Sequence, residues 1–204
     1  MKVCGITRLT DALHAVQQGA TALGFVFWPN SPRYVTPERA AEIIAELPSS
    51  VTTVGVFVNE TVDGIRGIVA RAGVTAVQLH GDEPPSYADA IAWPIFRSVT
   101  LDVIADVGSA WPADTTLLVD AADRDRRGGT GVAVDWSRAA DVARRHRVVL
   151  AGGLTPANVA DAIATVRPFG VDVSSGVEDA PGVKSLEKVT RFLANARHAF
   201  ERQS

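Results

Sequence analysis

The chain has 204 residues, of which 47% are hydrophobic and 21% charged, the composition of an ordinary globular protein long enough to bury one sizeable core. Its 20 Lys and Arg stand against 23 Asp and Glu, a formal charge of −3, which argues against nucleic-acid and anionic-membrane partners. A lone cysteine cannot form an internal disulfide, and neither a signal peptide nor a membrane-spanning run is visible, so we expect one domain over residues 1–204 in the cytoplasm.

Eight short apolar runs rich in β-branched residues recur along the chain. They are nearly continuous in apolar residues rather than alternating, which is typical of strands buried on both faces of a parallel sheet. The predicted strands are Lys2–Ile6, Ala22–Phe27, Thr53–Val58, Ala76–His80, Ile95–Val99, Leu117–Asp120, Val148–Ala151 and Val171–Ser174.

A turn and a helical pattern follow most of these strands. The first helix is expected to begin at a Thr or Asp cap and to end at Gly19, and Pro37 and Gly73 mark the start and the end of two others. The segment Leu101–Ala110 is interrupted by Gly108 and Ser109. The predicted helices are Thr10–Gln18, Thr36–Leu47, Thr61–Ala72, Pro84–Ala92, Asp135–Arg145, Pro156–Val166 and Ser185–Phe200.

Eight such units of about 25 residues each fit a small α/β fold, a single (β/α)8 TIM barrel. The alternative is a doubly wound open sheet, which places its ligand at one topological switch point. Polar and glycine-rich segments here follow the first, sixth, seventh and eighth strands alike. That spread favours the barrel, in which the loops after all eight strands meet at one face.

Small residues follow both the seventh and the eighth strand, where barrels of this kind commonly bind phosphate. Free backbone N–H groups in such loops can hold an anion, although glycines also form ordinary tight turns. The flanking Asp172 and Lys184 either belong to this site or are solvated surface charges. We predict phosphate binding by Gly152, Gly153, Ser174, Ser175 and Gly176.

Two strand ends carry groups suited to proton transfer. Cys4 ends the first strand, and Gly5 leaves space beside it, so the thiol is either a small buried hydrophobe or a base or nucleophile with a lowered pKa. Asp120 follows three apolar residues in LLVD. It is either a loop carboxylate or an acid in the mouth of the barrel, because an unpaired carboxylate is costly to bury.

Two further side chains are candidates for substrate contact. Arg33, in NSPRYV after the second strand, could pair with a ligand carboxylate or be an ordinary surface arginine. His80, in VQLHG, could titrate near neutral pH or serve as a hydrogen-bonded structural residue. His14, His146 and His198 lie in helical patterns. No metal-ligand spacing, GxGxxG or P-loop is present, so we expect neither a metal nor a cofactor.

The segment after the sixth strand, RRGGTGVAVDW, contains Gly128, Gly129 and Gly131. These glycines could let the loop close over a ligand, or could only form a turn before the helix capped by Asp135.

Taken together, KVCGIT, LGFVFWPNSPRYV, GVFVN, VQLHGDE, LLVDA, GGTGVAVDW, LAGGLTPANV and VDVSSGVEDAPGVKS closely resemble the phosphoribosylanthranilate isomerase family of tryptophan biosynthesis. The motifs run from Lys2 to Ser185 in the order of the family. Such a series is far more specific than a shared fold, which alone does not imply a function.

The resemblance implies an Amadori rearrangement of N-(5-phosphoribosyl)anthranilate to 1-(2-carboxyphenylamino)-1-deoxyribulose 5-phosphate, without cofactor or metal. It implies that Cys4 is the general base, that Asp120 is the general acid, that Arg33 faces the anthranilate carboxylate, and that the loops LAGGL and DVSSG hold the phosphate. From its place at a strand end, we also expect His80 to contact the substrate. The alternative is a non-catalytic or differently specific phosphosugar-binding barrel. The sequence does not fix the oligomeric state, for which we expect a monomer.

Overall fold

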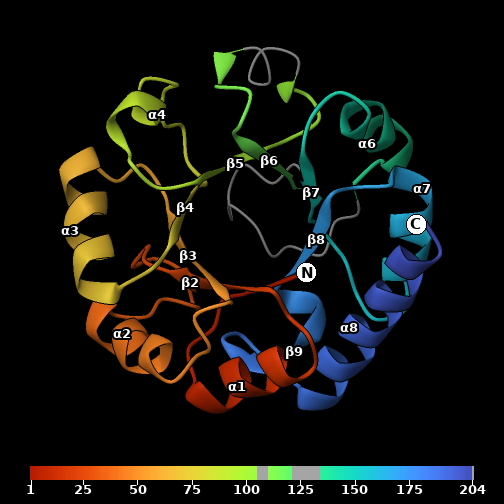
Figure 1. Cartoon of the computed structure of the whole chain (residues 1–204), viewed down its shortest axis with the longest axis horizontal. Coiled ribbons are helices and arrows are strands. Elements are labelled where there is room, and N and C mark those ends of the chain that lie inside the picture. The colour runs from red at the N-terminus through yellow and green to blue at the C-terminus, as the bar shows by residue number, and fades with distance from the viewer. Residues whose placement is uncertain (105–109, 121–133, 204) are drawn as a thin grey trace.

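The structure, a computed structural model, describes residues 1–104, 110–120 and 134–203. Eight parallel strands close into a barrel in chain order, and β8 pairs with β1 (Figure 1). This confirms the predicted barrel and excludes the open sheet. The strands are β1 (Lys2–Cys4), β2 (Ala22–Val26), β3 (Thr52–Phe57), β4 (Ala76–Leu79), β5 (Ile95–Val99), β6 (Thr116–Val119), β7 (Val148–Leu150) and β8 (Gly170–Val173).

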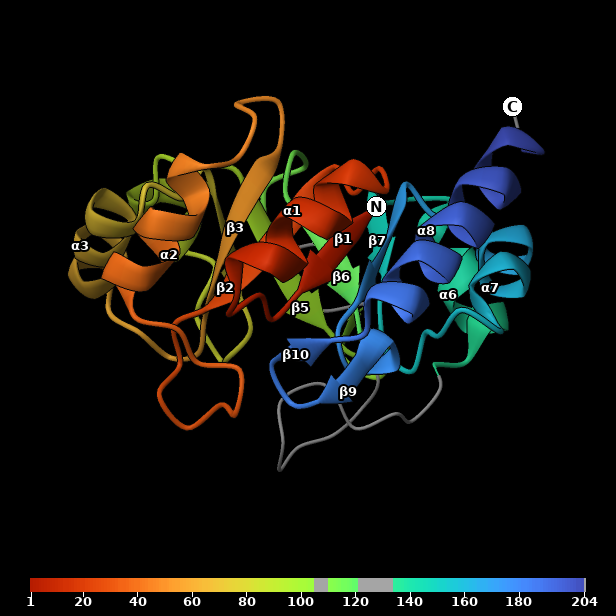
Figure 2. The same cartoon turned by 90° about the horizontal axis from the view of Figure 1, so that it is seen from below.

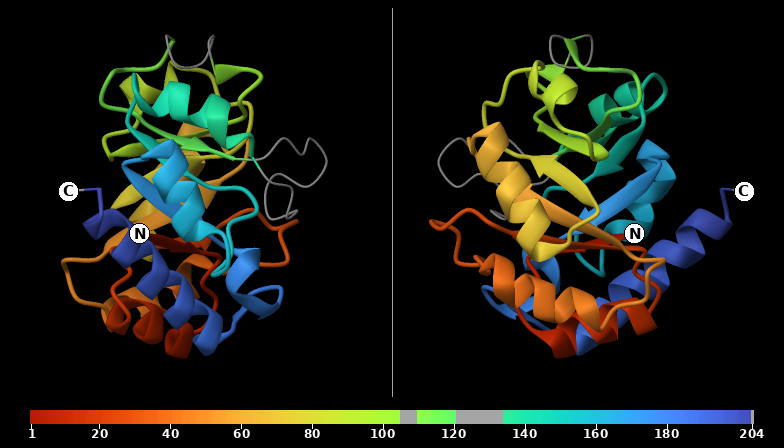
Figure 3. Two further views of the ribbon diagram at one scale, coloured as in Figure 1. Left: turned by 90° about the vertical axis from the view of Figure 1, so that its right-hand side faces the viewer. Right: turned by 60° about the vertical axis from the view of Figure 1, so that its left-hand side comes forward.

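Helices surround the barrel, and their ends follow from local sequence signals. Thr36 and Thr61 cap two of them by accepting hydrogen bonds from backbone N–H groups, and Gly73 ends one with φ +74°. The C-terminal helix packs along two neighbours on the outside of the barrel (Figure 3). The described helices are α1 (Leu9–Gln17), α2 (Pro37–Ala45), α3 (Val62–Ala72), α4 (Tyr87–Ala90), α6 (Trp136–Ala143), α7 (Val159–Val166) and α8 (Leu186–Glu201).

Three helix starts and lengths differ from the prediction. Arg8, not a Thr or Asp, occupies the N-cap of α1 and makes no side-chain cap bond there. The helix α4 has a single turn, and its backbone is already extended at Ile91. The helix α7 begins three residues after Pro156, because Asn158 accepts a hydrogen bond from the backbone of Thr155 and holds the chain in a turn.

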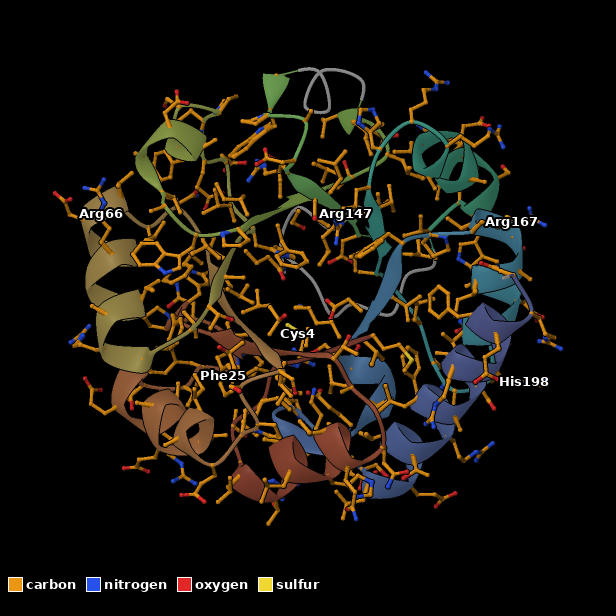
Figure 4. All side chains as sticks on the ribbon, in the orientation of Figure 1. Cys4, Phe25, Arg66, Arg147, Arg167 and His198 are labelled. Carbon is orange, nitrogen blue, oxygen red and sulfur yellow. The ribbon has the colours of Figure 1, made fainter. Side chains whose placement is uncertain are left out.

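The side chains of each strand alternate between the helices and the barrel interior. Figure 4 shows Phe25 directed towards the helices and Cys4 near the middle of the barrel. The outward side chains form the main core with the helices, whereas Cys4, Val26 and Val56 form a small cluster inside. Among the described residues, no helix combines the length and apolar character needed to cross a membrane.

A short hairpin follows β8 that the sequence pattern did not predict. After a 3-10 turn at Ser175–Val177, β9 (Glu178–Ala180) pairs antiparallel with β10 (Val183–Lys184). Figure 2 shows this hairpin at one end of the barrel, beside the ends of β1 and β8. It therefore adds side chains to the face on which the strand ends meet.

Candidate active site

The thiol of Cys4 lies inside the barrel at the last residue of β1, and Cys4 is 8% exposed. A Cβ atom at Gly24, its register partner on β2, would come within 2.7 Å of Sγ. Gly24 therefore makes room for the thiol on the neighbouring strand. Gly5 has φ +77° and makes room for Arg33, whose Cδ would lie 2.6 Å from a Cβ there.

The protonation of Cys4 also differs from the prediction of a lowered pKa. Burial raises the pKa of the thiol above its usual value, because a buried thiolate loses its hydration. The positive charges of Lys2 and Lys184 act in the opposite direction, and the carboxylate of Asp172 adds to the rise. In this structure Cys4 is thus a thiol at neutral pH, and its ionisation depends on the charges around it.

Two of those charged groups form a buried ion pair between neighbouring strands. Lys2 on β1 faces Asp172 on β8, with Nζ 3.0 Å from Oδ1 and side chains only 3% and 9% exposed. The alternative that Asp172 is a solvated surface charge is therefore wrong. The same holds for Lys184, which is 2% exposed and donates to Glu178 at 2.7 Å.

Asp120 and His80 lie close together, directly after the last residues of β6 and β4. The Nε2 atom of His80 is 3.7 Å from Oδ2 of Asp120, and each side chain is 13% exposed. Gln78 Nε2 lies 2.9 Å from the other ring nitrogen. Burial, followed by the charge of Lys2, lowers the pKa of His80 to about 4. Of the two alternatives for His80, the structure favours the hydrogen-bonded residue with a neutral ring over a group that titrates near neutral pH.

Arg33 is not an ordinary surface arginine, since its side chain is 14% exposed. Its Nε and Nη2 atoms donate hydrogen bonds of 2.9 and 2.7 Å to the carboxylate of Glu178. This carboxylate occupies one edge of the guanidinium group. No described residue accepts a hydrogen bond from Nη1. The remaining edge can therefore take a planar carboxylate while Glu178 fixes the orientation of the fork.

Glu178 is the residue of this site that the sequence analysis missed. Burial alone would raise its pKa, but hydrogen bonds and charges from Arg33 and Lys184 outweigh it and hold the pKa below the usual range. Its position in SSGVED, four residues after Ser174, was the available signal. Lys2 was also missed, although a lysine two residues before Cys4 shares its face of the strand.

The small-residue loops after β7 and β8 lie against each other. Gly152 and Gly153 have φ +76° and +68°, and a Cβ atom at Gly176 would collide with the backbone oxygen of Leu154. Among the described residues, no backbone carbonyl accepts a hydrogen bond from the N–H groups of Gly152 or Gly153. Ser174 lies beside Gly5, with Oγ 3.2 Å from the position of a Cβ on that glycine. The predicted phosphate residues thus lie in one region.

Two sequence predictions concern other parts of the site. The glycine-rich segment with Gly128, Gly129 and Gly131 lies outside the described residues. Within the described part of the chain, no three His, Cys, Asp or Glu side chains are grouped closely enough to hold a metal ion.

A family model described as N-(5'-phosphoribosyl)anthranilate isomerase matches residues 1–195. A relative in Trichlorobacter lovleyi, named N-(5'-phosphoribosyl)anthranilate isomerase, is 48% identical over 206 residues, covering 98% of each chain. The crystal structure of phosphoribosyl anthranilate isomerase from Thermotoga maritima is 41% identical and has a TM-score of 0.89, covering 97% of this chain and 98% of that one.

A second solved structure carries a bound ligand. It is a phosphoribosyl anthranilate isomerase in complex with reduced 1-(o-carboxyphenylamino)-1-deoxyribulose 5-phosphate, with 41% identity, a TM-score of 0.85 and 97% coverage of both chains. The matches span nearly the whole chain in sequence and in fold. The chain therefore belongs to the N-(5'-phosphoribosyl)anthranilate isomerase family.

Proposed function

We propose that this chain carries out the isomerisation for which its family is named, with Cys4 as general base and Asp120 as general acid. The substrate is N-(5'-phosphoribosyl)anthranilate, and the product is 1-(2-carboxyphenylamino)-1-deoxyribulose 5-phosphate. The observation that carries the proposal is the meeting of a buried thiol, a carboxyl group and an arginine fork at one end of a closed barrel.

The rearrangement needs two proton transfers. Asp120 delivers a proton to the ring oxygen of the furanose, the ring C–O bond breaks, and the anthranilate nitrogen supplies the electrons to form a C=N bond. Cys4 then removes the proton from the adjacent sugar carbon, which gives the enolamine, and this tautomerises to the ketone. Each positioned acid or base of this kind typically contributes about 10²- to 10⁴-fold. No electrons are gained or lost overall, so the reaction requires no redox cofactor.

The two ends of the substrate bind on opposite sides of the proton-transfer groups. The phosphate lies on the backbone N–H groups of the two small-residue loops, near Gly153 and Ser175, where the backbone offers donors without side-chain obstruction. The anthranilate carboxylate lies against the open edge of Arg33. Neutral His80, held by Gln78, lies 3.7 Å from Asp120 and lines the site beside the acid without adding charge.

The chain is further proposed to be a cytoplasmic monomer. The single cysteine fits a reducing compartment. One related structure is of monomers generated from the phosphoribosylanthranilate isomerase of Thermotoga maritima, which is itself dimeric, so a dimer is the competing state. Analytical ultracentrifugation of the purified chain at micromolar concentration tests this, and a sedimenting species of twice the chain mass contradicts it.

Turnover measured by the loss of anthranilate-type fluorescence tests the proposed reaction. The unmodified chain is expected to convert the substrate, and Asp120→Asn to lose at least about 100-fold in kcat because an amide cannot deliver the proton. A chain that binds the reduced product analogue but shows no turnover would instead be a phosphosugar-binding barrel. Wild-type kcat in Asp120→Asn would remove Asp120 from the mechanism.

A further inference from the structure

The interior of the barrel holds a positive charge directly below the thiol. Lys2 and Cys4 are two residues apart on β1, so both side chains point into the barrel, separated by about 6.6 Å along the strand. The register places Asp172 beside Lys2 and Gly24 beside Cys4. The ammonium group thus lies one layer beneath the reacting group.

This lysine is held in its charged form despite its burial. Burial alone would lower the pKa of Lys2, but the charge of Asp172, joined by that of Cys4 in its thiolate form, outweighs it and raises the pKa. The Nζ atom lies 3.0 Å from Oδ1 of Asp172, and its charge and a side-chain hydrogen bond also act on Cys4. A buried ammonium is costly unless neighbouring groups use its charge.

The charged groups near the thiol of Cys4 come from its own strand and from β8 and the segments that follow β2, β4, β6 and β8, whereas β2 and β3 face it with uncharged residues. The facing residues of β2 and β3 are uncharged: Gly24, Val26 and Val56. The charged or titratable groups around Cys4 are Lys2 on its own strand, Asp172 on β8, Lys184 on β10, His80 beyond β4, Asp120 after β6 and Arg33 after β2. Glu178 already engages Lys184 and Arg33, and His80 is neutral.

We propose that Lys2 is a positioning residue of the isomerase, whose buried ammonium, anchored by Asp172, stabilises the thiolate of Cys4 from inside the barrel. The inference rests on the proposed function, because a stabilised thiolate matters only where Cys4 takes a proton. When the thiol loses its proton, the donors on Nζ face a full negative charge. Asp172 keeps Lys2 charged before that step and prevents it from giving up its own proton to the thiolate.

Chemical modification of the thiol tests this inference directly, because Cys4 is the only cysteine in the sequence and all thiol alkylation occurs there. The rate of alkylation by iodoacetamide, measured against pH, gives the titration midpoint of Cys4 in each variant. Lys2→Met is expected to move the midpoint upward by about one pH unit or more, the usual effect of removing an opposite charge in this range. The acid limb of kcat/KM against pH should move upward by the same amount.

A control variant separates the local charge from the net charge. Arg191→Met on α8 also removes one positive charge, from a side chain that is 64% exposed on the outer surface, and should leave the midpoint unchanged. If the Lys2–Asp172 pair serves only to join β1 to β8, its loss in Lys2→Met would lower the melting temperature but leave the titration midpoint of Cys4 unchanged. An unchanged midpoint in folded Lys2→Met therefore overturns the inference.

A double variant and a comparison of the titration midpoint with the kcat/KM profile separate the effect of Lys2 from that of an unpaired Asp172. Lys2→Met leaves Asp172 buried without a partner, so a double variant, Lys2→Met with Asp172→Leu, replaces the whole pair by apolar groups, which barrels tolerate better. Its midpoint should lie between those of the wild type and Lys2→Met, and a midpoint at or below the wild type overturns the inference. If the midpoint of Lys2→Met moves but the kcat/KM limb does not, Cys4 is not the base, and the proposed function fails instead.

Discussion

Replacing Gly24 by alanine tests whether the reaction depends on the position of the Cys4 thiol. The new Cβ atom would lie 2.7 Å from Sγ and 3.2 Å from Cα of Cys4, on the backbone of the paired strand. Carbon atoms pack at about 3.5–4.0 Å, so the thiol has to retreat by roughly 1 Å. A displacement of about 1 Å at a reacting group can cost about 100-fold in rate. We therefore expect kcat to fall by that order while the barrel loses about 1–3 kcal/mol of stability from overpacking.

Gly67→Ala is the matched control for this substitution. Gly67 lies on α3, and a Cβ atom added there would have nothing within 4 Å, so the same chemical change meets open space. Its kcat should equal that of the wild type, and its melting temperature should rise slightly, because alanine in a helix is favoured over glycine by about 0.5–1 kcal/mol. Steady-state kinetics and thermal unfolding are measured for both variants. Wild-type kcat in a folded Gly24→Ala variant would refute the dependence on thiol position.

Three other outcomes follow from the contacts at the site. Glu178→Gln should raise KM and lower the unfolding free energy by about 3 kcal/mol or more, because Arg33 loses its anchor, whereas exposed Asp179→Asn should change neither. Gly176→Asp should raise KM strongly, since any side chain there meets the backbone of Leu154, and an unchanged KM would exclude the loop from phosphate binding. The depressed pKa of His80 gives stability that is complete above pH 6.5 and is lost as the pH falls towards 4, by up to about 3 kcal/mol. Urea unfolding of His80→Gln should lack this part of the pH dependence, and an unaltered pH dependence would contradict the assignment.

The barrel could be predicted from the sequence because its strands and caps are local signals. Runs such as Val148–Ala151 are apolar throughout, which marks strands covered on both faces, and Thr36, Thr61 and Gly73 bound their helices. Each predicted strand agrees with an observed one to within two residues. The first strand ends early because Gly5 turns to a positive φ directly after Cys4.

The charged part of the site could not be predicted, because charged residues are exposed on average and a sequence does not say which are paired. Asp172 and Lys184 can be buried because each pairs with an opposite charge. Asp172 pairs with Lys2, which is distant in the chain, and Lys184 pairs with Glu178 across a short hairpin. The hairpin β9–β10 has no apolar alternation to predict it, and the buried ion pair between Lys184 and Glu178 joins its two strands. The raised pKa of Cys4 follows from that burial, which the sequence alone does not reveal.

Single-turnover rates of Cys4→Ala and Cys4→Ser, together with their affinity for the reduced product analogue, test the catalytic role of the thiol most directly. Both variants should bind the analogue nearly as well as the wild type, because the base acts in the transition state. Cys4→Ala should show no measurable isomerisation, and Cys4→Ser should recover little, since a hydroxyl without a neighbouring base is a far weaker proton acceptor. Near-wild-type isomerisation by Cys4→Ala would contradict the mechanism and make the thiol a packing residue of the barrel interior.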